Sequence, residues 1–228
     1  MSQQLNSQKS VLQRSLSVSE IAHFSENIDV LREAAAWVRN YLARPHPALG
    51  RTGTVCPFAK PALVKDTVRV AVVRLTDSNK RAQIMEAVQY HLEAFVSRAA
   101  QDGDRILHAT LILFPDVSLE EAPELIDRTK EELKTKFIQQ GLMLGEFHPR
   151  NESPGLHNPE FKPLRSPIPM LAIRHMVPTD FVFLNRPEYD TVTRLKYLEA
   201  YLAVPDLPRS SRDDVERAAA SLRAEAHN

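Results

Sequence analysis

Apolar residues recur at helical spacing soon after the beginning of the chain. Between Glu20 and Ala43 they lie three and four positions apart, which places them on one face of a helix. The same spacing, or a helix-start signal such as the Ser118-Leu-Glu-Glu sequence, appears again further along. These signals predict helices at residues 78–100, 118–140, 188–201 and 211–226.

Runs of β-branched and other apolar residues separate these helices. They predict strands at residues 67–75, 108–115, 142–148 and 170–176. Helices that alternate with strands are typical of the α/β class. We therefore expect a single sheet of about four or more strands with packed helices, plus helical arms at both ends.

Two segments are punctuated by proline. Residues 44–61 hold four prolines and two glycines, so we expect a shaped loop there. Residues 149–169 form a second loop, and connections of that length are usually functional. We predict a flexible arm over residues 1–19, one α/β domain over 20–205 and a C-terminal helix over 206–228.

Composition narrows the classes of function. The chain has 228 residues, with 29 Lys and Arg against 29 Asp and Glu, so its formal net charge is zero and nothing attracts it to nucleic acid or a membrane surface. Cys56 is the single cysteine, which excludes an intrachain disulfide and favours a cytoplasmic location. No apolar run reaches the length of a membrane span, and the six glycines form no phosphate-binding loop.

Three residues are candidates for metal ligation. His148 stands where a strand enters the second loop, so its ring can face a cavity. His175 lies in a strand, on the face opposite Arg174, where it is either a packed core residue or a ligand. Cys56 is either a small buried hydrophobic residue or a thiolate that binds a metal or attacks a substrate.

Arginines gather in and near the second loop. Arg150, Arg165, Arg174 and Arg186 carry forked guanidinium groups that suit a substrate carboxylate or a propionate. The alternative is that they are solvated surface residues.

Three sequence blocks, at residues 50–61, 147–156 and 163–177, resemble a bacterial family described mainly as a domain of unknown function. The blocks contain Cys-Pro-Phe-Ala, His-Pro-Arg-Asn-Glu-Ser and Ile-Arg-His-Met. Their order is also similar, more distantly, to the family of haem-dependent N-hydroxylases of guanidine compounds.

That second resemblance implies a haem b cofactor and a haem-dependent oxygenase of natural-product biosynthesis. His148 would be the axial ligand, with His175 or Cys56 as alternatives, and Arg150, Arg165 or Arg174 would meet the propionates. The substrate would be a nitrogen-containing small molecule, such as a guanidine or an aromatic amine, and the reaction N-oxygenation, hydroxylation or oxidation of an amine to a nitro group.

Two other functions stay open. The same pocket would serve a small-molecule-binding or accessory protein of a biosynthetic cluster that uses no haem. A structural partner protein would instead use its amphipathic first and last helices to form a homodimer or a complex.

Overall fold

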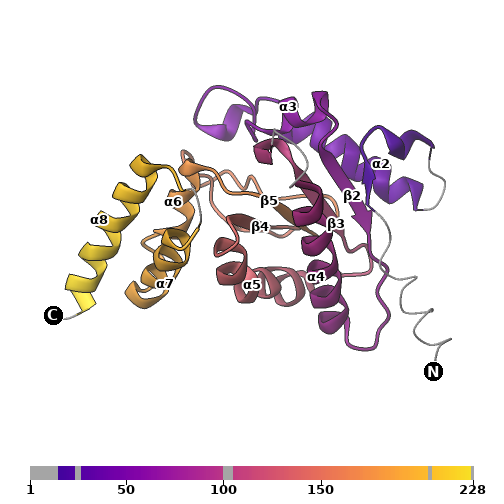
Figure 1. The fold of residues 1–228 in the computed structure, drawn as a ribbon. Helices are drawn as coiled ribbons and strands as arrows, with labels where there is room; N and C mark the ends of the chain where they lie inside the picture. The colour runs from indigo at the N-terminus through magenta and orange to yellow at the C-terminus, as the bar shows by residue number, and fades with distance from the viewer. Residues whose placement is uncertain (1–14, 24–26, 100–104, 205–206, 227–228) are drawn as a thin grey trace. The chain divides into compact units, whose positions relative to one another are not determined.

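The computed structural model describes residues 15–23, 27–99, 105–204 and 207–226 (Figure 1). The chain is an α/β protein with one mixed sheet, as the sequence predicts, and the strand order is β1-β2-β3-β5-β4. The strands are β1 (Leu16–Ser17), β2 (Val68–Val72), β3 (Ala109–Leu113), β4 (Leu142–Phe147) and β5 (Met170–His175).

The strand pairs follow from the connections between them. β2 and β3 are parallel, with Val68 opposite Ala109, and the long crossover between them contains α4 (Lys80–Ala99). β3 and β5 are antiparallel, with Leu113 opposite Met170. β1 pairs antiparallel with β2, so two residues of the segment predicted as an arm extend the sheet.

The remaining helices agree with most of the predicted ones. They are α2 (Ile28–Trp37), α3 (Ala59–Val64), α5 (Arg128–Ile138), α6 (Phe181–Leu184), α7 (Thr191–Leu202) and α8 (Arg209–Ala226). The predicted capping sequence is present, because Ser118 and Glu121 exchange hydrogen bonds of 2.9 and 3.3 Å. In the described part of the chain, no helix is both long and apolar enough to span a membrane.

Three predicted boundaries are wrong. The first helix is not continuous from residue 20, because Glu20–His23 is a separate 3-10 turn and Asn27, with φ of 51°, precedes α2. The helix predicted from residue 118 begins with a π-helical segment, Pro123–Asp127, before α5. The first proline-rich segment ends in α3, where the missing N–H of Pro61 falls in the first turn and costs no helical hydrogen bond.

The described residues form two compact units. Unit 1 comprises the chain up to Glu131 together with Gly145–Arg174, and unit 2 comprises Glu132–Leu144 and the chain from His175 onward. The predicted division into an arm, one domain over 20–205 and a terminal helix stays a prediction. Residues 1–14 of the predicted arm lie outside the described residues.

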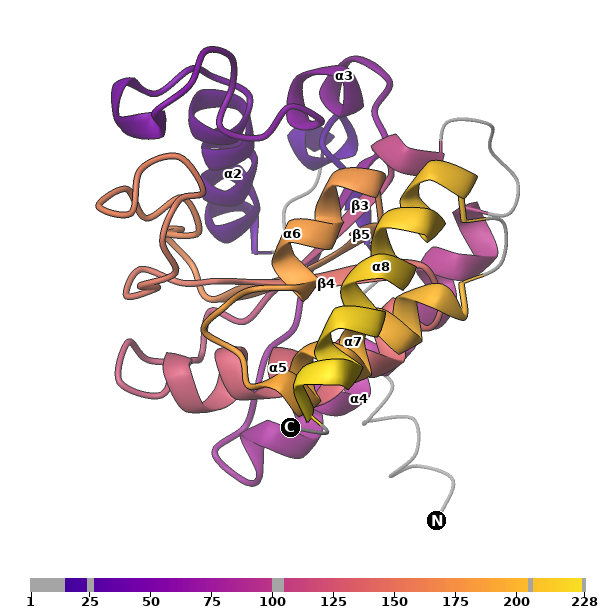
Figure 2. The same ribbon diagram turned by 90° about the vertical axis from the view of Figure 1, so that its left-hand side faces the viewer.

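Unit 1 has apolar layers on both faces of its strands. α2 covers one face and α4 the other, as Figure 2 shows. Residues of β2, β3 and β5 pack with α2 at alternate positions, among them Val68, Val70, Val72, Leu111, Leu113 and Met170. Buried residues of α4 recur at helical spacing and include Ile84, Ala87, Val88, Leu92 and Phe95.

Unit 2 has a smaller core between α7 and α8. Its buried members on these two helices are Tyr197, Leu198, Ala200, Tyr201, Val215, Ala219 and Leu222. Asp190 caps α7 by accepting the Thr193 N–H at 2.8 Å. The predicted C-terminal helix therefore packs on its neighbour in sequence.

His91 is a polar residue on the buried side of α4. It is 1% exposed, and its Nε2 atom has no hydrogen-bond partner among the described residues. Burial, with a smaller contribution from the charge of Arg98, lowers the pKa of His91 from 6.5 to about 4. The imidazole is therefore neutral in the folded protein at neutral pH.

We predict that His91→Leu reduces the loss of stability on acidification. As the pH falls from 6.5 towards about 4, the unfolded chain gains a proton at His91 that the folded chain does not. The contribution of neutral His91 to the free energy of unfolding is thus fully present above pH 6.5. It falls by up to about 3 kcal/mol as the pH approaches 4. Urea unfolding at about pH 7 and about pH 4.5 measures the difference. The exposed His157→Gln variant should behave like the wild type, and an undiminished loss in His91→Leu contradicts the prediction.

Candidate functional site

The second proline-rich loop, residues 149–169, is held against α2 and the first loop by an aromatic cluster. We use this name for Trp37, Tyr41, His46, Phe147 and Phe161. The ring centroids of His46 and Phe161 are 4.6 Å apart and stacked, and those of Trp37 and Phe147 are 5.4 Å apart and edge-on. Tyr41 lies between the two pairs. Phe161 is the member of the cluster that lies in the loop, and the cluster attaches the loop through it.

Hydrogen bonds from buried side chains to loop carbonyl groups add to this attachment. Trp37 Nε1 donates to the carbonyl of Arg165 at 3.2 Å, and the Tyr41 hydroxyl donates to that of Pro163 at 3.2 Å. Burial raises the pKa of Tyr41, so its hydroxyl keeps the proton that it donates. These bonds give partners to two backbone carbonyl groups of a loop that forms no strand pairing of its own.

Gly50 lets the two proline-rich loops approach closely. Its φ is +75°, and a Cβ atom at this position would lie 2.7 Å from the carbonyl oxygen of His157. The glycine is therefore required both by backbone conformation and by space. Gly53 also has a positive φ, of +94°, but a Cβ there would meet only the end of the Arg51 side chain.

We predict that Gly50→Ala destabilises the protein more than Gly53→Ala. Both substitutions strain the backbone, whereas only the first forces two loop backbones apart, which costs about a further 1–3 kcal/mol. Denaturant unfolding of the two variants measures this difference directly. Equal losses would show that the contact between the loops contributes little.

Beside the loop, polar side chains of β4 and of the residue after it contact polar side chains at Asp127 and in the first turn of α5. Alternation along β4 buries Glu146, and continues to His148 immediately after the strand. Lys130 Nζ lies 3.2 Å from a Glu146 oxygen, and His148 Nε2 lies 3.0 and 3.2 Å from the two oxygens of Asp127. Two charged or polar pairs therefore occupy positions where apolar residues are usual.

His148 is fully buried, and its two ring nitrogens differ. The Asp127 carboxylate accepts a hydrogen bond, which assigns the ring proton to Nε2. Nδ1 has no partner among the described residues. The His148 carbonyl in turn accepts the N–H of Asn151 at 3.1 Å, so the residue fixes both the Asp127 carboxylate and the first turn of the loop.

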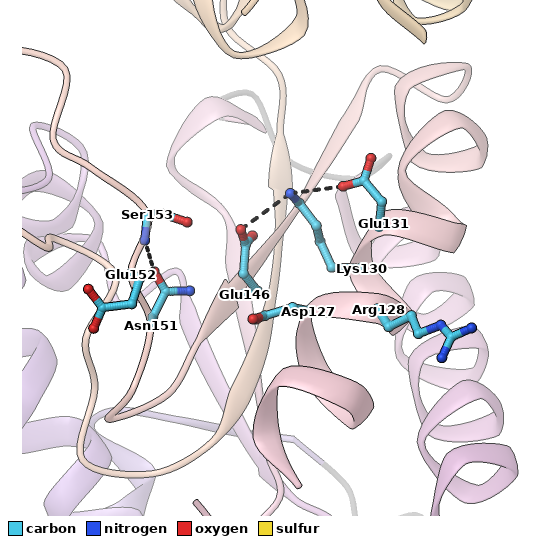
Figure 3. Close-up of a pocket in the computed structure, with 8 residues that line it drawn as sticks. All are labelled: Asp127, Arg128, Lys130, Glu131, Glu146, Asn151, Glu152 and Ser153. Carbon is cyan, nitrogen blue, oxygen red and sulfur yellow. Dashed lines mark hydrogen bonds and ion pairs between the residues drawn. The ribbon is translucent and has the colours of Figure 1, made fainter. Parts of the chain in front are cut away.

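A polar pocket of about 530 Å³ opens beside these pairs (Figure 3). It is lined by Asp127, Arg128, Lys130, Glu131, Glu146, Asn151, Glu152 and Ser153. Four of these residues are carboxylates and two are cations. Lys130 is paired with Glu146 and Glu131, and Arg128 with Glu124 at 2.5 Å, so both cations are already engaged. The pocket has an excess of negative charge.

The structure brings together few of the residues predicted as a site. His148 lies behind the pocket, and Arg165 donates from Nε to the carbonyl of Asn151 at 3.1 Å and pairs with Glu152. Arg150 is exposed. Arg174 lies in β5 opposite Ala109.

The other two predicted ligands lie elsewhere. Cys56 is partly buried in the first loop, where its N–H donates to the carbonyl of Leu42 at 2.9 Å. His175 closes β5 and belongs to unit 2. Arg186, also in unit 2, lies 5.5 Å from the ring centroid of Phe183. Of the four predicted arginines, Arg165 is already engaged by Glu152 and by the carbonyl of Asn151.

These residues do not fit a haem group in this structure. His148 has its Nε2 engaged by Asp127 and its side chain fully buried. The pocket beside it has charged and polar walls, whereas a haem plane needs apolar ones. Across the described ranges, no three His, Cys, Asp or Glu residues are grouped to hold a metal ion.

The sequence reasoning missed Asp127 and Glu146. A signal was present, because Asp127 and Lys130 are three apart and Glu146 and His148 are two apart. Residues three apart share one face of a helix, and residues two apart share one face of a strand. Asn151 stands among the polar residues that accompany the arginines of the second loop, and the sequence alone gives it no role of its own.

The fold and pocket define an α/β protein with an acidic, polar pocket. The chain belongs to the family described as "Domain of unknown function (DUF6875)", whose model matches residues 31–213. Neither the curated proteins nor the solved structures contain a match to it.

Proposed function

We propose that this protein binds a small, positively charged nitrogen compound in the acidic pocket, and does so without haem. The observation that carries the proposal is the imbalance of the lining, which has four carboxylates and two cations. Lys130 is shared by Glu146 and Glu131, Arg128 pairs with Glu124 outside the lining, and Glu152 pairs with Arg165. Asp127 has no Lys or Arg partner among the described residues. Ammonium and guanidinium groups form strong, charge-assisted hydrogen bonds with carboxylates. An amine or a guanidine is thus the ligand class with the complementary chemistry.

Burial makes Glu146 the strongest anchor in this lining. Its side chain is 11% exposed, so a charge–charge interaction there is screened less than at the surface. The Lys130 amine lies between Glu146 and Glu131, as Figure 3 shows, and marks a position where a nitrogen cation is stable. A ligand cation would share these carboxylates with Lys130 or displace it.

His148 supports the same function by orienting Asp127, one of the carboxylates that line the pocket. Its Nε2–H holds both oxygens of Asp127, whose side chain is 41% exposed at the pocket. A carboxylate oriented in this way is ready for a ligand donor without reorganisation. In this proposal His148 is a positioning residue and does not touch the ligand.

We predict that methylguanidine binds and that its neutral isostere methylurea does not, as followed by nitrogen-15 NMR titration. Glu146→Gln and, separately, Glu131→Gln should each weaken methylguanidine binding by about tenfold, because each removes one charged acceptor. The exposed Glu216→Gln variant serves as the control and should bind like the wild type. Methylurea binding as tightly as methylguanidine, or no methylguanidine binding at all, contradicts the proposal.

A haem titration tests the N-oxygenase expected from the resemblance. We predict no Soret band that saturates at one equivalent of haemin, before or after dithionite and carbon monoxide, because His148 is buried and paired with Asp127. Absorption spectra of the wild type, His148→Ala and His175→Ala make the measurement. A stoichiometric Soret band that one of these variants loses would contradict the prediction and favour the haem enzyme.

A further inference from the structure

Asn151 contributes a neutral donor to a pocket that is otherwise dominated by charge. The residue is 2% exposed, yet it lines the pocket. Its Oδ1 accepts the N–H of Ser153 at 2.9 Å, and this bond fixes which side of the amide carries oxygen. The Nδ2 group therefore points into the pocket, as Figure 3 shows, and has no hydrogen-bond partner among the described residues.

The backbone around this amide is held in place. The Asn151 N–H donates to the carbonyl of His148 at 3.1 Å, and its own carbonyl accepts from Arg165 Nε at 3.1 Å. The side-chain bond to Ser153 adds a third attachment. The donor is thus oriented before any ligand arrives, which lowers the entropic cost of binding.

The Nδ2 atom is not sealed off from the pocket, so a ligand oxygen can reach it and accept its hydrogen bond. We propose that the ligand is bifunctional: its cationic nitrogen lies against the carboxylates, and an uncharged acceptor oxygen receives a hydrogen bond from Asn151 Nδ2. This inference rests on the proposed function and narrows its ligand class to amines or guanidines that carry an ether, carbonyl or hydroxyl oxygen. A ligand carboxylate is disfavoured because the lining already holds four of them.

Two amines of equal size test this inference. 3-Methoxypropylamine and pentylamine have the same number of non-hydrogen atoms and differ by an ether oxygen in place of a methylene group. An ether oxygen only accepts hydrogen bonds. We expect the wild type to bind 3-methoxypropylamine about three- to tenfold more tightly than pentylamine in nitrogen-15 NMR titrations, the range that one neutral hydrogen bond provides.

Asn151→Asp is the matched variant. It keeps an oxygen for the Ser153 N–H and replaces the free donor by a second acceptor. The preference for the ether should disappear, while pentylamine should bind at least as tightly as before because a carboxylate has been added. Gln139→Glu adds the same charge at an exposed position that does not line the pocket, and should keep the wild-type preference.

The outcomes separate this inference from the proposed function. Equal affinity for both amines in the wild type overturns the role of Asn151 and leaves the cation site intact. A preference for the ether that persists in Asn151→Asp also overturns it. If neither amine binds and methylguanidine does not bind either, the acidic pocket is not a cation site and both proposals fail.

Discussion

The pairing of the two buried polar side chains of β4 and the residue after it with partners at residues 127–130 is the constraint on which the pocket depends. Taking an ion out of water costs several kcal/mol unless a partner compensates for the lost hydration. Glu146 therefore requires Lys130, and the buried Nε2–H of His148 requires an acceptor, which Asp127 supplies. Because the partners come from different elements, the register of strand against helix is set by these pairs as well as by apolar packing. Apolar residues in place of Lys130 and His148 would fill the same space but would not orient the carboxylates of Glu146 and Asp127.

The loop of residues 149–169 supplies the other wall of the pocket. It is attached by the rings around Phe161 and by hydrogen bonds to its backbone carbonyls, and it depends on the close approach of Gly50 to the backbone of His157. Loops that carry function are usually positioned by a rigid scaffold. Here the scaffold is α2 together with the first proline-rich loop, and the three residues that the second loop adds to the pocket are Asn151, Glu152 and Ser153.

Hydrophobic periodicity predicted most of the fold, including the sheet, α4 and the two last helices. It did not predict β1, which has only two residues and exists because the edge of β2 offers hydrogen bonds. For the candidate site, proline content and loop length singled out a segment that adds three residues to the pocket lining, and His148 lies behind the pocket. Its partner Asp127 is 21 residues away in sequence. That contact depends on how β4 packs against another element, which local patterns do not specify.

The position of Trp37 has an optical consequence. It is the single tryptophan of the chain, and its indole lies between α2 and the loop, with Nε1 bonded to the carbonyl of Arg165. Because indole emission depends on exposure to water and on hydrogen bonding, intrinsic fluorescence excited at the tryptophan band reports on this junction and not on the chain as a whole. A built-in fluorophore therefore reports on the seating of the loop while the surrounding core of unit 1 stays folded, because Trp37 also belongs to that core.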